Sequence, residues 1–168
     1  ALESQSGIAL RNDLERVFPG SWSDVVQLLE SWRPHLKWDT FLTCLSEHLD
    51  EEDGLGRLSL WRAYGGSTGV LNGEVFLRPS DALKAYTSPV AYLTKDRFVQ
   101  EFSLVAKLIQ ENAEFVASIG RDLAVGQVFE MLRSAALCTK HPGFSEEREW
   151  RVIYSPSAQS ERLVRSIE

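Results

Sequence analysis

The strongest constraint on the fold of this chain is an apolar repeat that runs from Asp96 to Ile119. Apolar side chains recur there at steps of three and four residues, which places them on one broad face of a helix. They are Phe98, Phe102, Val105, Ile109, Ala113 and Val116. Gly120 ends this pattern. A second helical pattern follows, carried by Val125, Val128, Phe129, Leu132 and Ala136. The sequence therefore predicts a pair of consecutive helices, each with a buried apolar face.

Two shorter helices are predicted before this pair. Residues 21–33 carry apolar side chains at helical spacing, and Ser21 is placed to cap their first turn. Pro34 is expected to stop this helix, because proline removes a backbone donor. Residues 58–66 predict a further helix that ends in two glycines.

Strands are expected where β-branched and aromatic residues cluster, at residues 40–46, 68–77 and 88–94. An Asn72-Gly73 turn interrupts the second of these, and the third starts near Pro89, as an edge strand can. Strands before and after a helical pair, without regular alternation of strand and helix, indicate an α+β fold. We expect a mainly antiparallel sheet with the long helical pair inserted before the last strand.

The length of 168 residues suits a single globular domain, and no linker or repeat divides the sequence. Residues 1–168 are therefore expected to form one domain. The first residues lack the basic start and apolar core of a signal peptide, and they also lack an initiating methionine. A start partway through a longer natural protein stays open.

Composition disfavours several classes of function. A net charge of -6 argues against nucleic-acid binding, and no apolar run approaches the roughly 20 residues of a membrane-spanning helix. Cys44 and Cys138 fit no metal or disulfide spacing and predict two buried free thiols, which suits a cytoplasmic location. The three histidines show no metal-ligand spacing, so no metal is expected.

Residues 143–154, GFSEEREWRVIY, run from charged residues into an apolar and aromatic end, and they predict the last strand. Alternate residues of a strand face opposite sides of the sheet. One side is expected to carry Glu147, Glu149 and Arg151. The other side, with Trp150, Val152 and Tyr154, is expected to anchor the core.

Two carboxylates at this spacing would stand roughly 7 Å apart, and mutual repulsion would raise the pKa of one of them unless a cation offset it. A carboxylate fixed on a strand can orient a sugar hydroxyl or stabilise a developing positive charge. The competing interpretation is a solvated strand face with weak ion pairs, which is the commoner role of such residues.

Three segments in order resemble a known family: FLTCLSE at 41–47, LWRAYGGSTGV at 60–70, and the ending from Lys140 through Phe144 to Arg151. They resemble the bacterial domain of unknown function 2971. In that family a Cys-Phe-Ser-like strand end precedes Leu-Trp, a tyrosine and a glycine-led strand. A lysine, an aromatic residue and Glu-x-Glu-aromatic-Arg follow. Leu45 replaces the usual aromatic residue of the first segment.

This family looks like the ADP-ribosyltransferase fold, so the resemblance implies a bacterial enzyme that cleaves NAD or transfers its ADP-ribosyl group. It implies Glu149 as the catalytic glutamate and Glu147 as the residue that orients the acceptor. It implies nucleotide contacts from Ser46, Trp61, Tyr64 and Arg151. Trp61 and Tyr64 could stack on a ring, although core packing on a helix is the ordinary role of such residues.

The family's opening strand, which in ADP-ribosyltransferases anchors NAD, is not evident in this sequence; Asn12-Asp13 is only a faint echo of it. A non-catalytic interaction or sensor module of a bacterial defence or stress system is therefore the alternative. A small-molecule nucleotide or a protein partner suits these two hypotheses, and the sequence leaves the acceptor and the oligomeric state open.

Overall fold

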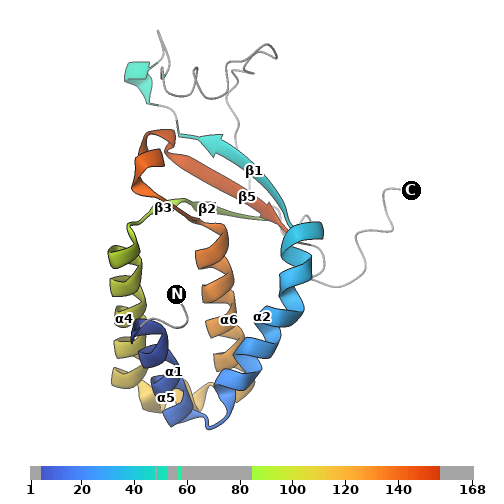
Figure 1. Ribbon diagram of the computed structural model, residues 1–168, viewed down its shortest axis with the longest axis vertical. Helices are drawn as coiled ribbons and strands as arrows, with labels where there is room; N and C mark the ends of the chain where they lie inside the picture. Colours follow the sequence, from blue (N-terminus) through green and yellow to red (C-terminus); the bar gives the residue numbers. More distant parts are fainter. Residues whose placement is uncertain (1–4, 48, 53–56, 58–84, 156–168) are drawn as a thin grey trace, which may run out of the picture. The chain divides into compact units, whose positions relative to one another are not determined.

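The computed structural model describes residues 5–47, 49–52, 57 and 85–155, without the side chains of Ser6 and Glu52 (Figure 1). The chain divides into two compact units. The helical unit comprises Ala1–Trp38 and Leu93–Thr139, and the sheet unit comprises Asp39–Tyr92 and Lys140–Glu168. The expectation of one domain is not tested by this division and stays a prediction.

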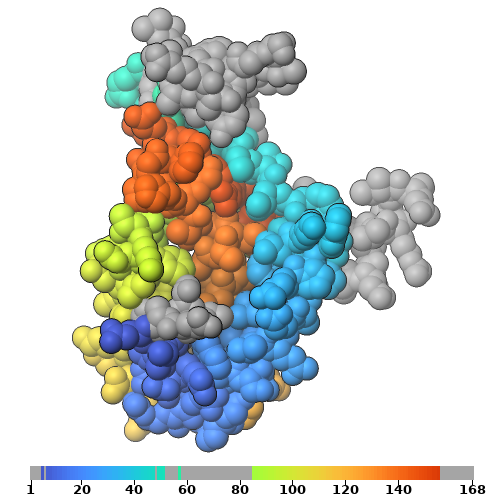
Figure 2. All heavy atoms as spheres, viewed as in Figure 1, coloured from blue at the N-terminus to red at the C-terminus, as the bar shows by residue number. Residues whose placement is uncertain are grey.

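The helical unit contains five described helices. They are α1 (Gln5–Val17), α2 (Ser21–Trp38), α4 (Lys95–Glu111), α5 (Ala113–Ser118) and α6 (Arg121–Leu137). Helix α1 packs on α4 and α2 packs on α6, as the ribbon of this unit shows (Figure 1). In the view of Figure 2, side chains of α1 and α2, in blue, cover much of the visible face of the unit, and atoms of α4, in yellow-green, lie at its left edge.

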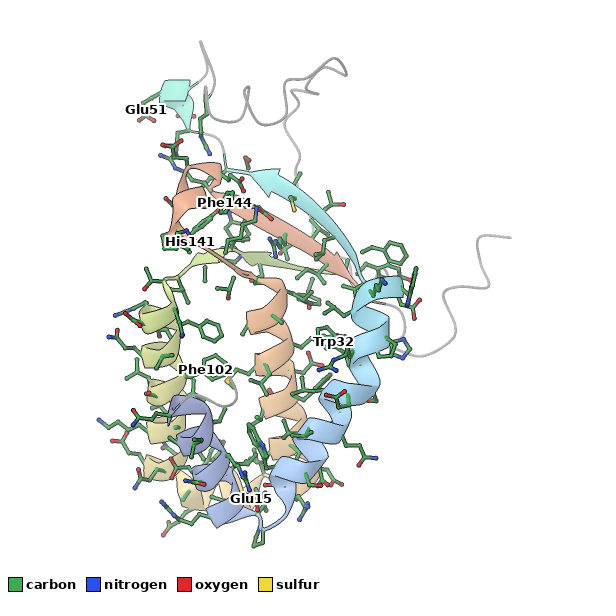
Figure 3. The ribbon with its side chains drawn as sticks, viewed as in Figure 1. Glu15, Trp32, Glu51, Phe102, His141 and Phe144 are labelled. Carbon is green, nitrogen blue, oxygen red and sulfur yellow. The ribbon has the colours of Figure 1, made fainter. Side chains whose placement is uncertain are left out.

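The core of this unit forms because each helix turns one apolar stripe inward. Leu10 and Leu14 of α1 are four residues apart and, like Val25 of α2, are fully buried. The other buried members of the cluster are Phe102, Ala106, Val125, Val128 and Leu132. The ring of Phe102 points into the interior, and Trp32 of α2 meets Phe129 edge to face (Figure 3).

The turn between α1 and α2 is held by a side chain of α1. The Glu15 carboxylate accepts hydrogen bonds from the backbone N–H groups of Gly20, at 2.7 Å, and of Trp22, at 2.6 Å. These bonds lower the pKa of Glu15. Gly20 has a φ of 80°, a conformation that favours glycine. Glu15 thus satisfies free donors at the start of α2, where a negative charge is also favourable.

Arg121, the first residue of α6, ties this turn to the rest of the helical unit. Its Nη1 donates to the Pro19 carbonyl at 2.7 Å, and its Nη2 lies 2.7 Å from Asp24 Oδ2.

Several predicted helices differ from the structure. Helix α1 was not expected, and α2 continues through Pro34 to Trp38. Ser21 is not the predicted cap, because its hydroxyl is buried and finds no hydrogen-bond partner among the described residues. The single helix predicted over residues 96–119 divides at Asn112 into α4 and α5.

The sheet unit confirms the α+β class. Its antiparallel three-stranded sheet has the order β1 (Phe41–Ser46), β5 (Glu149–Tyr154), β2 (Tyr86–Pro89). A second sheet pairs β3 (Ala91–Tyr92) with β4 (Thr139–Lys140). The described residues of this unit also include two 3-10 turns, η1 (Asp50–Glu52) and η2 (Pro142–Glu147). In chain order α4, α5 and α6 stand between β3 and β4.

The predicted strand over residues 40–46 is confirmed, but the other two described strand predictions need correction. Residues 88–94 divide between β2 and β3, and Pro89 ends β2 at the edge of the described sheet. In β5 the buried apolar residue is Ile153, on the same side as Glu149, whereas Trp150 is 38% exposed. The prediction that Trp150, Val152 and Tyr154 anchor the core is therefore wrong. Strand periodicity defines two faces without saying which one is covered.

The helix predicted over residues 58–66 and the strand predicted over residues 68–77 lie outside the described residues. Within the described part of the chain, no helix is long and apolar enough to cross a membrane. Both cysteines are free; Cys138 is buried as expected, but Cys44 is exposed.

Truncation of a buried α1 side chain should make the protein less stable to unfolding. Leu14→Ala removes a fully buried side chain, and we expect it to lower the free energy of unfolding by about 2–5 kcal/mol. Ile8→Ala, on the exposed side of the same helix, should change it by no more than about 0.5 kcal/mol. Urea unfolding measures both, and equal losses would contradict the described core.

Removal of the Glu15 charge should weaken the α1–α2 turn in a pH-dependent way. Because the pKa of Glu15 is lowered in the folded protein, its contribution is present above the unfolded pKa and is lost as pH falls through the folded pKa. Glu15→Gln should therefore lower the melting temperature at pH 7 and match the wild type in acid. Glu30→Gln, an exposed change on α2, is the control, and an unchanged melting temperature for Glu15→Gln at pH 7 would refute the role.

Candidate functional site

The candidate site is built around Glu149, the first residue of β5. This residue is only 4% exposed. Its Oε1 accepts a hydrogen bond from Arg151 Nε at 2.6 Å, and its Oε2 accepts one from the Lys140 ammonium. Its backbone is also fixed, since its N–H donates to the Tyr92 hydroxyl at 2.8 Å and its carbonyl accepts from Val90 at 2.9 Å. Both carboxylate oxygens and both backbone groups of Glu149 are therefore engaged.

Lys140 of β4 brings the second glutamate into the site. Its ammonium lies 2.6 Å from Glu147 Oε2 and also binds Glu149, so it bridges the two carboxylates. The ring of Phe144 lies 5.6 Å from the same nitrogen, within the range of a cation–π contact. Figure 3 shows Phe144 on the η2 turn and His141 directly before it.

The backbone conformation at Arg148 makes this bridge possible. Glu147 ends η2, and Arg148 follows in the left-handed conformation with φ 41° and ψ 53°. Arg148 is held there by backbone bonds to Ser145, at 3.2 Å, and to Glu47, at 2.9 Å. The prediction that Glu147 and Glu149 share a strand face is therefore wrong. They converge because a turn, and not a strand, separates them.

The end of β1 is attached to the same turn. The Arg57 guanidinium donates to the Glu146 carbonyl at 2.7 Å and also to the carbonyl of Glu47. This contact fixes η2 against the strand that carries Ser46.

Strand register places Ser46 at the site. Ser46 pairs with Glu149, and Cys44 pairs with Arg151. Residues directly opposite in an antiparallel pair project on the same face. On the other side of β5, Ser88 of β2 also pairs with Arg151. One face of the sheet therefore carries two serines, a thiol, Glu149 and Arg151, and Ser46 lies opposite Glu149 on that face.

The charges of the site reinforce one another. Burial opposes ionisation of Glu149, but hydrogen bonds from Arg151, Cys44 and Lys140 outweigh it and lower the pKa of Glu149 to about 2. Burial likewise opposes the charge of Lys140, but its bonds to Glu147 and Glu149 raise its pKa. Partial burial of the Cys44 thiol, together with its hydrogen bond to Glu149, raises the pKa of Cys44. Near neutral pH Glu149 is thus a carboxylate and Lys140 is an ammonium.

Not every predicted site residue can be placed. Ion pairs join Glu149 to Arg151 and, through Lys140, to Glu147, and Ser46 is paired with Glu149 in the sheet. Trp61 and Tyr64 lie outside the described residues. Among the described residues, no group of three or more histidine, cysteine, aspartate or glutamate side chains could hold a metal ion.

Sequence reasoning missed the roles of Tyr92, Cys44 and Lys140. Lys140 was noted only as part of a motif. Tyr92 carried no signal beyond its place in a predicted strand, because its partner is the backbone of a residue 57 positions away. The Cys44 contact follows from the alignment of β1 with β5, and alternation within one strand cannot give that alignment.

Comparison with known proteins adds one finding. No curated protein and no solved structure matches the chain. A family described as a protein of unknown function (DUF2971) matches residues 60–152, which is over half of the sequence. The matched range contains Tyr92, Lys140, Glu147, Glu149 and Arg151, and it begins after β1. The chain belongs to the DUF2971 family.

Proposed function

We propose that the chain is an ADP-ribosyltransferase-like enzyme that cleaves the bond between nicotinamide and ribose in NAD, with Glu149 as the catalytic carboxylate. The observation that carries the proposal is the pairing of Ser46 with Glu149, which puts an exposed hydroxyl and a fixed, ionised carboxylate on one sheet face. Such a pair suits a substrate that bears sugar hydroxyls and develops positive charge.

In this mechanism Glu149 accepts a hydrogen bond from a hydroxyl of the nicotinamide ribose. As the bond between C1 of the ribose and the ring nitrogen breaks, nicotinamide leaves with the bonding electron pair. The negative charge of Glu149 stabilises the positive charge that develops on the ribose. An acceptor, either water or a side chain of another protein, donates an electron pair to C1 and releases its proton to solvent. Glu147 orients this acceptor.

Glu149 is bound by Arg151 and Lys140, and one of these two contacts would have to be replaced when the substrate binds. Arg151 lies in the same strand and holds Oε1 at 2.6 Å. Lys140 lies on a different strand, β4, and has the more flexible side chain, because its ammonium stands at the end of a four-carbon chain. The positively charged nicotinamide ribosyl group would replace the ammonium at Oε2, while Glu147 retains Lys140.

Substitution of Glu149 tests this assignment. Glu149→Gln keeps the shape of the side chain and removes the charge, so we expect nicotinamide release from NAD to fall at least about 100-fold. Chromatography of NAD and nicotinamide measures the rate, and Glu30→Gln on α2 should leave it unchanged. Undiminished cleavage by Glu149→Gln would refute the role of Glu149, and no cleavage by the wild type would refute the function.

A second candidate is a non-catalytic interaction or sensor module. The observation that favours it is the 4% exposure of Glu149, with both oxygens already bound to cations. In this case the cluster joins β4, η2 and β5 and has no substrate. Calorimetry with NAD separates the candidates, since the module should show no binding at this site.

For both candidate functions, the ion cluster should make the free energy of unfolding depend on pH in the acidic range. The pKa of Glu149 is about 2 in the folded protein, against roughly 4.3 for an unfolded glutamate. Its contribution is therefore present above pH 4.3 and is lost as pH falls toward 2. Between pH 5 and pH 3, the free energy of unfolding should fall more steeply for the wild type than for Glu149→Gln. Urea unfolding at each pH measures the two slopes, and equal slopes would contradict the lowered pKa.

A further inference from the structure

The hydroxyl of Tyr92 holds a position in the candidate site that the proposed mechanism leaves unused. Tyr92 is half-buried in β3, and its hydroxyl oxygen accepts the backbone N–H of Glu149 at 2.8 Å. Because β3 pairs with β4, this tyrosine also lies on the strand beside the one that carries Lys140. The Tyr92 hydroxyl therefore contacts Glu149, the residue whose carboxylate is the centre of the site.

A tyrosine hydroxyl can accept and donate at the same time. In Tyr92 the accepting role is taken by Glu149 N–H. Among the described residues, no acceptor is found for the hydroxyl hydrogen of Tyr92. The Tyr92 hydroxyl, held by the backbone N–H of Glu149, can therefore still donate its hydrogen. The side chain of the same residue is ionised at neutral pH and can only accept.

A donor beside an acceptor is the arrangement that recognises a hydroxyl group. The hydroxyl of a ligand can donate to a carboxylate and accept from a phenol, and a ligand without it leaves both groups unpaired.

We propose that Tyr92 donates its phenolic hydrogen to the same ribose hydroxyl that Glu149 accepts from, and so selects substrates that carry this hydroxyl. The inference rests on the proposed function. The substrate class is then a nicotinamide nucleotide with a free 2′-hydroxyl on the nicotinamide ribose. Hydrogen bonds to a sugar 2-hydroxyl strengthen as the glycosidic bond breaks, so the contact would contribute to the rate as well as to binding.

The experiment pairs a change in the protein with a change in the ligand. Tyr92→Phe keeps the ring and removes the hydroxyl, and the NAD analogue without the 2′-hydroxyl of the nicotinamide ribose removes the other partner. We expect Tyr92→Phe to lower kcat/KM for NAD at least about tenfold and to leave kcat/KM for the analogue unchanged. Tyr154→Phe, on the opposite face of β5, is the matched control and should affect neither substrate.

An equal loss with both substrates would overturn the proposal, because a merely structural tyrosine would harm them alike. No loss with either substrate would also overturn it while leaving the proposed function intact. A wild-type protein that cleaves neither substrate would overturn the function, and the role of Tyr92 with it. These results are therefore distinguishable.

A second variant covers the case in which Tyr92→Phe does not fold, since it leaves the Glu149 N–H without an acceptor. A fluorinated tyrosine at position 92 keeps the hydroxyl, strengthens it as a donor and weakens it as an acceptor. If Tyr92 donates to the substrate, kcat/KM for NAD should rise relative to that for the analogue. If the hydroxyl only supports the backbone, this ratio should stay constant and the proposal fails.

Discussion

The bridge that Lys140 forms between Glu147 and Glu149 fixes the arrangement of the candidate site. One ammonium joins the end of η2 to the start of β5 and is itself carried by β4. Without it, two carboxylates would approach each other across a turn with no cation between them, which disfavours ionisation of both. The bridge therefore fixes the position of Glu149, and through Glu149 it fixes the contacts to Arg151 and Tyr92.

Burial of Glu149 makes its charge costly in free energy. A carboxylate that is only 4% exposed loses most of its hydration, and a single ion pair often fails to offset that loss. Glu149 is supported by more than one pair: a guanidinium on one oxygen, an ammonium on the other, and a thiol contact from Cys44. This surplus of donors explains why its pKa falls to about 2 although burial alone would raise it. Buried ionic groups of this kind are weak evidence for stability, and their position on a shared polar face is what makes a functional role worth testing.

The sequence predicted the parts of the fold that local periodicity decides. Helix α6 and strand β1 are where their apolar patterns place them, and the α+β class follows from the order of the segments. Features that depend on tertiary contacts could not be predicted from the sequence. Glu15 caps α2 from the preceding helix in place of Ser21. A glycine usually marks a left-handed turn, and position 148 is an arginine. The sequence therefore predicts a strand that includes Glu147, whereas β5 begins at Glu149. The proximity of Ser46 and Glu149 was a hypothesis that needed the β1–β5 register to support it.

The two interpretations of the site differ in whether Lys140 can leave Glu149. A purely structural bridge gains from a lysine bound equally to both carboxylates, because neither contact is ever released. An enzyme that stabilises a cation needs a carboxylate whose counter-ion can be exchanged without being left unpaired. The arrangement of Lys140 meets both requirements, since it binds both carboxylates, and Glu147, at 2.6 Å from the same ammonium, would keep it if a substrate took its place at Glu149. Arg151 would meanwhile hold the other oxygen of Glu149, so the carboxylate would stay in position while the substrate replaces the lysine as its partner cation.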